Sequence, residues 1–169
     1  MAILQTTDFT GKHRISQEQN TVTVLQGYIN KYQPIYLAKL LGATLSDALL
    51  TDIGAGTDPT DPLFVAIFDP FQFDGDCGDL WISQGVVDYL KGLIYWHFMT
   101  DKRIQANPVS GTSNANTENS SNSNKPESQV YDRWNESITT MRSIQWYIEK
   151  NESDYPTYNG QRLLFNSAI

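Results

Sequence analysis

An apolar stripe near the C-terminal end constrains the fold of this chain more than any other feature. Across residues 127–151, apolar side chains recur at spacings of three and four: Val130, Trp134, Ile138, Met141, Ile144 and Ile148. This spacing places them on one side of an α-helix. Because a helix in water gains most of its stability by burying such a face, the stripe predicts a long, packed helix after Pro126.

A second long helix is predicted from Ser83, a residue type that often caps helices, to about Arg103. Its apolar face is unusually wide, which implies burial on more than one side, and it consists of Val86, Leu90, Leu93, Ile94, Tyr95, Trp96, His97 and Phe98. Gly85 and Gly92 lie seven residues apart and therefore share a face. Without side chains there, another helix can approach closely.

The first helix is expected to begin near Asn20 and to end at Gly42, which supplies a stop signal. Its apolar positions again follow helical spacing: Val22, Leu25, Ile29, Tyr32, Tyr36 and Leu40. Pro34 lies inside this pattern, so a kink or two short helices are predicted. A short helix over 43–52 and a loop over 54–62 should follow, and residues 63–80 are expected to form a loop with at most one helical turn.

The remaining segments carry few helical signals. Residues 1–20 are expected to form an extended arm, and residues 152–169 a tail with an apolar end. Residues 107–124 contain six Asn and five Ser with almost nothing apolar, so a mobile loop is predicted over 105–126. The sequence therefore predicts a mainly α fold over 1–169, a single-domain bundle of three to four main helices.

The charge of the chain is concentrated in one segment. The net charge is −7, and residues 43–82 contribute −8 of it through eight Asp without any Lys or Arg, so the rest sums to +1. No dense basic run is present, which disfavours tight binding to a DNA backbone. No apolar run is long enough to span a membrane, and the first residues do not look like a secretory signal.

Groups that carry out chemistry are sparse. His13 and His97 have no Cys or carboxylate nearby at ligand spacing, and no common catalytic or phosphate-binding motif occurs. Asp74, Asp76 and Asp79 form a weak candidate for a Ca²⁺ or Mg²⁺ loop, but an EF-hand-like loop would need a bidentate Glu where Gly85 stands. We therefore predict no catalytic residues, no cofactor, no required metal and no enzymatic activity.

Several stretches, in their order and spacing, resemble the head–tail connector proteins (head-completion or adaptor proteins) of tailed bacteriophages, including crAss-like phages. The stretches are Tyr28-Ile29-Asn30-Lys31-Tyr32, Tyr36-Leu37-Ala38-Lys39-Leu40-Leu41-Gly42, Ser83-Gln84-Gly85-Val86, Tyr95-Trp96-His97-Phe98, Glu118-Asn119-Ser120, and Ile144-Gln145-Trp146-Tyr147-Ile148 before Tyr155-Pro156. The resemblance implies a helical subunit of a ring, usually twelve-fold, in the virion neck. Its partners would be other copies, the portal protein, adjacent neck or tail rings and passing genomic DNA without tight binding. Assembly would occur in the host cytoplasm, without a membrane.

The 107–124 insertion and the N-terminal arm are predicted to be assembly elements, mobile in the free subunit and ordered on binding, because extended segments can wrap a partner. The alternative is a tolerated surface insertion with no partner. The apolar end of the tail is expected to pack on something. The candidate interface residues are Phe9, Val109, Gly111, Glu118, Asn119, Leu163, Leu164 and Phe165. The acidic segment either lines the channel and repels DNA or simply solvates a loop-rich surface. Two other functions stay open: a small helical adaptor that binds one protein partner, and an enzyme with an unrecognised carboxylate site.

Overall fold

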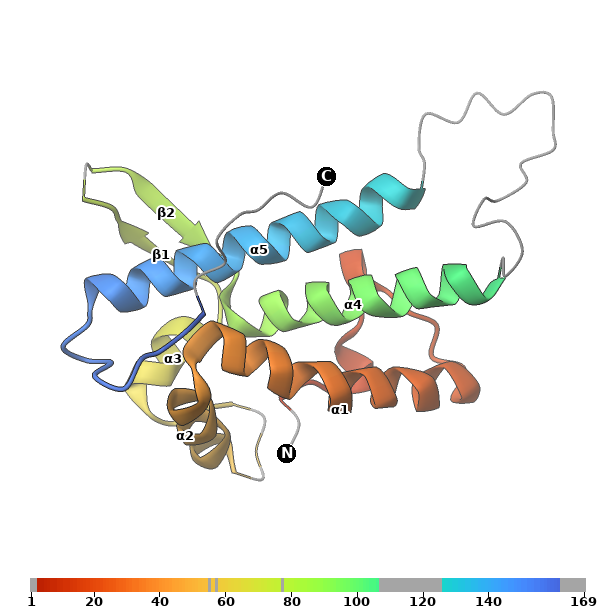
Figure 1. Cartoon of the computed structure of the whole chain (residues 1–169), viewed down its shortest axis with the longest axis horizontal. Coiled ribbons are helices and arrows are strands. Elements are labelled where there is room, and N and C mark those ends of the chain that lie inside the picture. The colour runs from red at the N-terminus through yellow and green to blue at the C-terminus, as the bar shows by residue number, and fades with distance from the viewer. Residues whose placement is uncertain (1–2, 55, 57, 77, 107–125, 162–169) are drawn as a thin grey trace.

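Three long helices form the body of the molecule (Figure 1). The computed structural model describes residues 3–54, 56, 58–76, 78–106 and 126–161, with the side chains of 103–106 and 126–128 excepted. The elements in chain order are two 3₁₀ turns (Thr6–Asp8 and Gly11–His13), α1 (Gln19–Leu41), α2 (Ala43–Ile53), α3 (Pro62–Phe68), β1 (Phe71–Asp74), β2 (Leu80–Ser83), α4 (Gly85–Ala106) and α5 (Pro126–Lys150). The predicted mainly α bundle is confirmed.

The pairing of α4 with α5 is the most extensive contact between elements, as the two apolar stripes require. Along α4, Leu90, Leu93 and Ile94 are fully buried, and along α5 so are Ile144 and Ile148. Trp134, the largest residue of the α5 stripe, is only partly buried and packs on Trp96 with ring centroids 4.6 Å apart.

Two glycines bring other parts of the chain close to α4, for different reasons. A Cβ at Gly92 would lie 1.9 Å from Ser137 Oγ on α5, so the missing side chain lets the two helices approach, as predicted. Gly85 instead has a φ of +77° and faces the Phe68 carbonyl oxygen, 2.4 Å from where a Cβ would lie. Gly85 therefore serves the turn into α4 and the close approach of the end of α3, and not the approach of α5.

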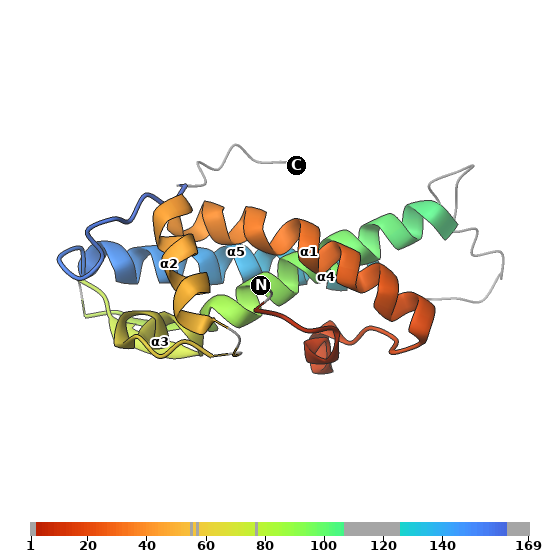
Figure 2. The ribbon, with the colours of Figure 1, turned by 90° about the horizontal axis from the view of Figure 1, so that it is seen from below.

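Helix α1 differs from its prediction in two details. It runs as one helix through Pro34, so of the two predicted outcomes, a kink or two short helices, the second does not occur. Pro34 and Asn30 are both exposed, so the Asn30 carbonyl that loses its helical partner can be hydrated by water. The helix begins after Glu18, so Asn20 is not its cap, whereas Gly42 ends it with a φ of +83°. After Gly42 the chain turns sharply into α2 (Figure 2).

Residues 63–80 do not form the predicted loop. They hold α3, β1 and the start of β2, and the two strands pair antiparallel with Phe73 opposite Trp81. Phe73 and Trp81 face α5, where the Trp81 and Trp146 rings are 4.1 Å apart. The strands have four residues each, which is too few for alternation to predict them. Contacts with α5 therefore stabilise two strands whose own sequence does not predict them.

The N-terminal arm lies against the bundle over residues 3–18 and is not a mobile extension. Leu4 and Phe9 are each 1 % exposed, and Ile15 is also buried. The Leu4 backbone N–H donates to Gln33 Oε1 on α1 at 2.9 Å. Spacing alone did not reveal this segment because its apolar residues follow neither helical nor strand periodicity.

The described part of the C-terminal tail also packs. The Gln161 N–H donates to the Lys39 carbonyl oxygen at 2.7 Å, and Gln145 on α5 donates to the Gln161 carbonyl oxygen at 3.1 Å. The Tyr155 hydroxyl donates to the Leu63 carbonyl oxygen at 2.7 Å. The tail therefore joins α1, α3 and α5 at one end of the bundle. The predicted loop residues 107–125 and the apolar end 162–169 lie outside the described residues.

Candidate assembly surfaces

One cluster of charged side chains fastens the arm to the two central helices. Lys12 Nζ lies 2.9 Å from Asp88 Oδ2 on α4 and 3.1 Å from Glu136 Oε2 on α5. Arg133 approaches the other oxygen of Glu136 at 2.6 Å. His13 is 3 % exposed and its Nδ1 is 3.8 Å from Asp88 Oδ1. The cluster thus connects three segments that are far apart in sequence.

The ionisation of this cluster suits a structural role better than acid–base chemistry. Burial lowers the pKa of His13 to about 4, so its ring is neutral at neutral pH. Burial alone would raise the pKa of Glu136, but hydrogen bonds from Arg133 and Lys12 outweigh it and hold that pKa below its ordinary value. Lys12 shows the matching effect, since its carboxylate partners outweigh burial and raise its pKa. None of these three groups titrates near pH 7, where a general acid or base is most effective.

A shallow groove opens beside this cluster, between β2 and the first half of α5. Its volume is about 690 Å³, and it is lined mainly by polar side chains: Lys12, Ile82, Gln84, Asp132, Arg133, Asn135, Glu136, Thr139 and Thr140. Small-molecule sites are usually enclosed and mostly apolar. An open, polar groove of this kind fits an extended peptide better than a small substrate.

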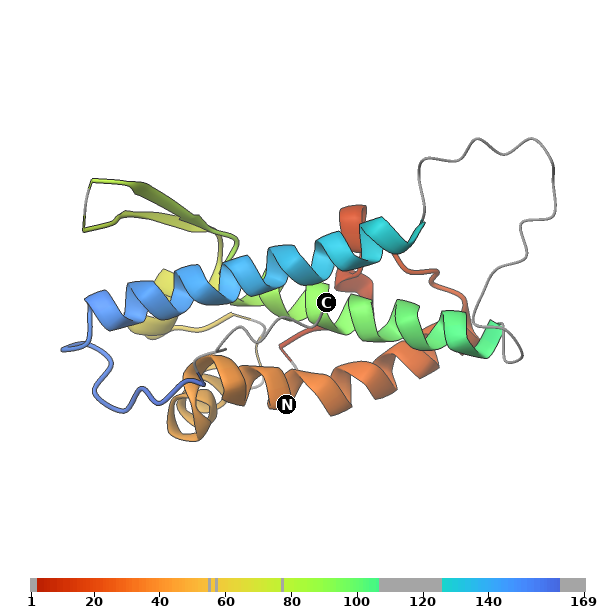
Figure 3. The same cartoon turned by 45° about the horizontal axis from the view of Figure 1, so that its top comes forward.

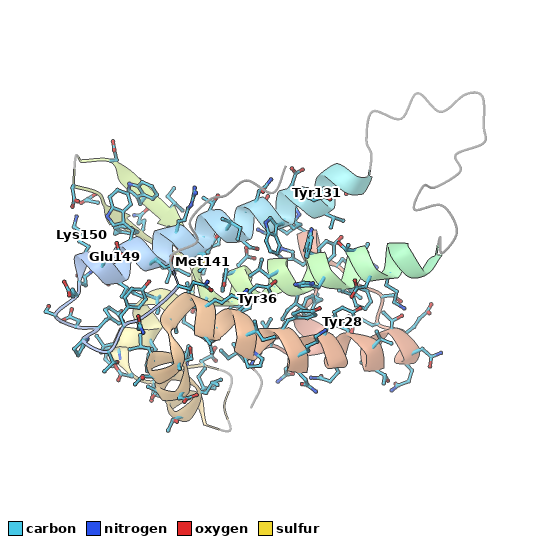
Figure 4. All side chains as sticks on the ribbon, in the orientation of Figure 1. Tyr28, Tyr36, Tyr131, Met141, Glu149 and Lys150 are labelled. Carbon is cyan, nitrogen blue, oxygen red and sulfur yellow. The ribbon has the colours of Figure 1, made fainter. Side chains whose placement is uncertain are left out.

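The second histidine belongs to an aromatic cluster between α1 and α4. His97 stacks on Tyr32 with ring centroids 3.8 Å apart, and its Nε2 lies 2.6 Å from the Tyr36 hydroxyl. Figure 4 shows Tyr36 pointing from α1 into the bundle. Burial lowers the pKa of His97. The Asp101 carboxylate, one turn further along α4, opposes that shift and accepts a hydrogen bond from the Tyr28 hydroxyl at 2.7 Å. These contacts hold α1 and α4 together.

The weak metal candidate forms the tip of the hairpin. Gly75 N–H donates to the Asp79 carbonyl oxygen at 2.7 Å, which closes the turn. Lys150, at the end of α5 (Figure 4), donates to the Asp74 carbonyl oxygen and lies 3.6 Å from Asp76 Oδ1. Among the described residues, which exclude Cys77, no group of three or more His, Cys, Asp or Glu side chains could hold a metal ion.

Two of the eight Asp in the acidic segment stabilise local structure. Asp52 accepts hydrogen bonds from the backbone of Thr60 and Asp61, and these bonds, led by the one from Asp61, lower its pKa. Asp61 in turn caps α3 by accepting from the Leu63 N–H at 2.9 Å. Other members, among them Asp47, Asp69 and Asp74, are exposed. They give the end of the molecule that holds α2, α3 and the hairpin an acidic surface.

An exposed stripe on α1 lies opposite its buried face. We define this α1 stripe as Val24, Gly27, Lys31 and Ile35, which follow helical spacing. Val24 is 41 % and Ile35 44 % exposed, and a Cβ added at Gly27 would meet nothing within 4 Å. The 23 residues of α1 contain Lys31 and Lys39 but no Asp or Glu. The stripe is therefore apolar with a basic edge.

The outer side of the hairpin is a second exposed apolar surface. Cross-strand pairing sets Ile82 opposite Gln72 and Leu80 opposite Asp74, and these four residues define the hairpin face. Leu80 is 59 % and Ile82 61 % exposed. Their neighbours in the strand, Phe73 and Trp81, occupy the other side and pack on α5. The hairpin segment 71–83 contains three Asp and no Lys or Arg, so this face is apolar with an acidic edge at the hairpin tip. At its other end, Ile82 also lines the groove that Lys12 and Arg133 border.

The two surfaces lie on opposite sides of the molecule. The hairpin projects beyond α5, whereas α1 lies on the far side of α4, and both Figure 1 and Figure 3 show this arrangement. Sequence reasoning missed both surfaces. The second stripe of α1 is visible in the sequence, whereas residues 80–83 show no alternation, and only the fold shows that both sides are left uncovered.

Of the eight predicted interface residues, the structure describes Phe9 alone. Phe9 is 1 % exposed in the core of the single chain, so its prediction as an assembly contact is wrong: its own bundle already covers it. Val109, Gly111, Glu118, Asn119, Leu163, Leu164 and Phe165 lie outside the described residues.

Comparison with known proteins adds no relative. No protein-family model, no curated protein and no solved structure matches the chain. None of the described helices combines the length and apolar character needed to cross a membrane.

Proposed function

We propose that this protein is a structural subunit of an oligomeric ring in the head–tail connector of a tailed phage, without enzymatic activity. The observation that carries the proposal is the pair of exposed apolar surfaces on opposite sides of one helical bundle, the α1 stripe and the hairpin face. Exposed apolar side chains that share one face can mark a protein–protein interface. A subunit that contacts a neighbour on each of two sides needs two such surfaces.

The resemblance of the sequence to connector proteins gives this assembly its setting. The ring would complete the head, lie between the portal protein and adjacent neck or tail rings, and surround the DNA channel in the virion. It would assemble in the host cytoplasm. The net charge of −7 favours a channel wall that repels passing DNA over one that binds it tightly.

A helical adaptor that binds one protein partner is the second candidate. The polar groove of about 690 Å³ between β2 and α5 favours it, because an extended segment of a partner could lie there. The two functions differ in stoichiometry. A ring subunit forms closed assemblies of its own copies, whereas an adaptor stays monomeric and binds one partner.

Native mass measurement of the purified chain, alone and with the portal protein of the same phage, tests the proposal. We expect a closed oligomer of the chain, either free or seated on the portal ring. A chain that stays monomeric in both samples would contradict the connector function. A stable one-to-one complex with a single partner would favour the adaptor.

A further inference from the structure

We propose that the α1 stripe of one copy packs against the hairpin face of the next copy, so that the subunits join head to tail. The inference rests on the proposed function, because it assigns the subunit contact of that ring. The occupant of each surface is then a second copy of this chain.

Charge complementarity identifies the partner of each surface. The α1 stripe is flanked by Lys31 and Lys39 on a helix without acidic residues, and Lys31 Nζ lies 4.7 Å above the Tyr32 ring. The hairpin face is flanked by exposed Asp74 and Asp79. Lys150 forms an ion pair with Asp76 and with neither the Asp74 nor the Asp79 carboxylate. A positive edge facing a negative edge favours the correct docking of two apolar surfaces.

The shapes of the two surfaces also fit. Val24 and Ile35 are eleven residues apart, so they stand about 16 Å apart along α1. Between them Gly27 has no side chain and open space above it. Leu80 and Ile82 project from alternate positions of a strand, about 7 Å apart. Along the helix Gly27 lies about 4.5 Å from Val24 and about 12 Å from Ile35. One branched side chain can therefore sit over Gly27 beside Val24, and the other then lies between Lys31 and Ile35.

Because the two surfaces differ and lie on opposite sides, the contact cannot be self-complementary about a two-fold axis. Different patches on one molecule make a heterologous contact, which yields a ring when the rotation between copies closes. A copy whose α1 stripe or hairpin face already binds a neighbour still offers its other face. The same contact therefore adds subunits until the ring is complete.

The pairing is tested with two variants that each block one surface. Ile35→Glu blocks the α1 stripe and Ile82→Lys blocks the hairpin face, and both residues are exposed enough to leave the fold intact, which circular dichroism checks. Tyr131→Glu is the matched control, since Tyr131 is 59 % exposed on α5, outside both surfaces (Figure 4). Native mass and sedimentation are measured for each full-length chain alone, and for Ile35→Glu mixed with Ile82→Lys.

We expect the wild type and Tyr131→Glu to form the same oligomer, and each blocking variant alone to weaken self-association at least about a hundredfold. A carboxylate at position 35 would face the acidic edge of the hairpin, and an ammonium group at position 82 would face Lys31. The mixture should associate again. The intact α1 stripe of the Ile82→Lys copy meets the intact hairpin face of the Ile35→Glu copy, and the other contact sets opposite charges together.

Two results would overturn the pairing and leave the ring function standing: either blocking variant keeps the wild-type mass, or the mixture stays monomeric. A wild type that is monomeric alone would also overturn it, because the contact would then be too weak to join subunits. Whether that monomer forms a ring on the portal would decide the proposed function separately.

Discussion

At the scale of single residues, His13 shows how burial sets chemistry. Its ring is 3 % exposed and packs near Tyr95, with centroids 5.7 Å apart. Desolvation penalises the charged imidazolium, and the nearby Lys12 and Arg133 add to that penalty, while Asp88 opposes it. The sequence placed His13 in an arm with nothing near it, so only the fold reveals this environment.

This environment makes stability depend on pH. The pKa of His13 is about 4 in the folded chain against an ordinary 6.5, so between those values the unfolded chain binds a proton that the folded chain does not. We expect the contribution of neutral His13 to the free energy of unfolding to be complete above pH 6.5. That free energy should fall by up to about 3 kcal/mol as the pH drops to 4. Urea unfolding at several pH values measures it.

His13→Phe keeps an aromatic ring beside Tyr95 but cannot be protonated. Its free energy of unfolding should therefore fall less steeply between pH 6.5 and 4 than that of the wild type. Some slope remains, because burial also lowers the pKa of His97. Identical slopes for variant and wild type would show that folding does not lower the pKa of His13.

At the scale of elements, glycines on two helices should respond in opposite directions. Gly27 lies on the exposed side of α1 with nothing within 4 Å of an added Cβ. Gly27→Ala should therefore stabilise the monomer by about 0.5–1 kcal/mol through helix propensity alone. Gly92→Ala gains the same propensity but places its Cβ 1.9 Å from Ser137 Oγ and 3.1 Å from the Arg133 carbonyl oxygen.

We expect Gly92→Ala to be destabilising overall, by about 1–3 kcal/mol, because α5 or the Ser137 hydroxyl has to move. That hydroxyl would also lose its 2.9 Å hydrogen bond to the Arg133 carbonyl oxygen. Thermal or chemical unfolding of both variants at a concentration where the chain is monomeric compares them. A stabilised Gly92→Ala would mean that α4 and α5 are not packed as closely as described.

At the scale of the whole molecule, the body of the fold should not need the Asn/Ser-rich insertion. The described contacts between α4 and α5, and those that hold the arm and tail, join residues on either side of it. Deleting Val109–Asn124 and closing the gap with a short Gly/Ser linker should change the free energy of unfolding by about 1 kcal/mol or less, since loop-closure entropy varies slowly with length.

The same deletion tests the prediction that this segment serves assembly. If it does, the shortened chain should fold normally but form fewer rings or attach fewer tails in particles. Shortened chains that assemble into DNA-filled, tailed particles at normal yield would show that the insertion has no such role. A chain that fails to fold would contradict the prediction about stability instead.

What the sequence determined by itself is the set of long helices and the uneven charge. The stripes of α1, α4 and α5 follow 3.6-residue spacing over many turns, so their periodicity predicts helices and their packing, and Gly42 and Gly92 mark where a helix ends or another approaches. The excess of Asp over residues 43–82 is a property of composition alone.

What only the tertiary structure decided is everything that depends on residues distant in sequence. The hairpin strands are too short for their own pattern to predict them, and Trp146 and Tyr147 of α5 hold them in place. Phe9 is buried because α1 and its neighbours cover the arm, and His13 is neutral for the same reason. The exposure of Ile35 and Ile82 is likewise decided by which surfaces the folded bundle leaves uncovered, since burial is a property of packing and not of local spacing.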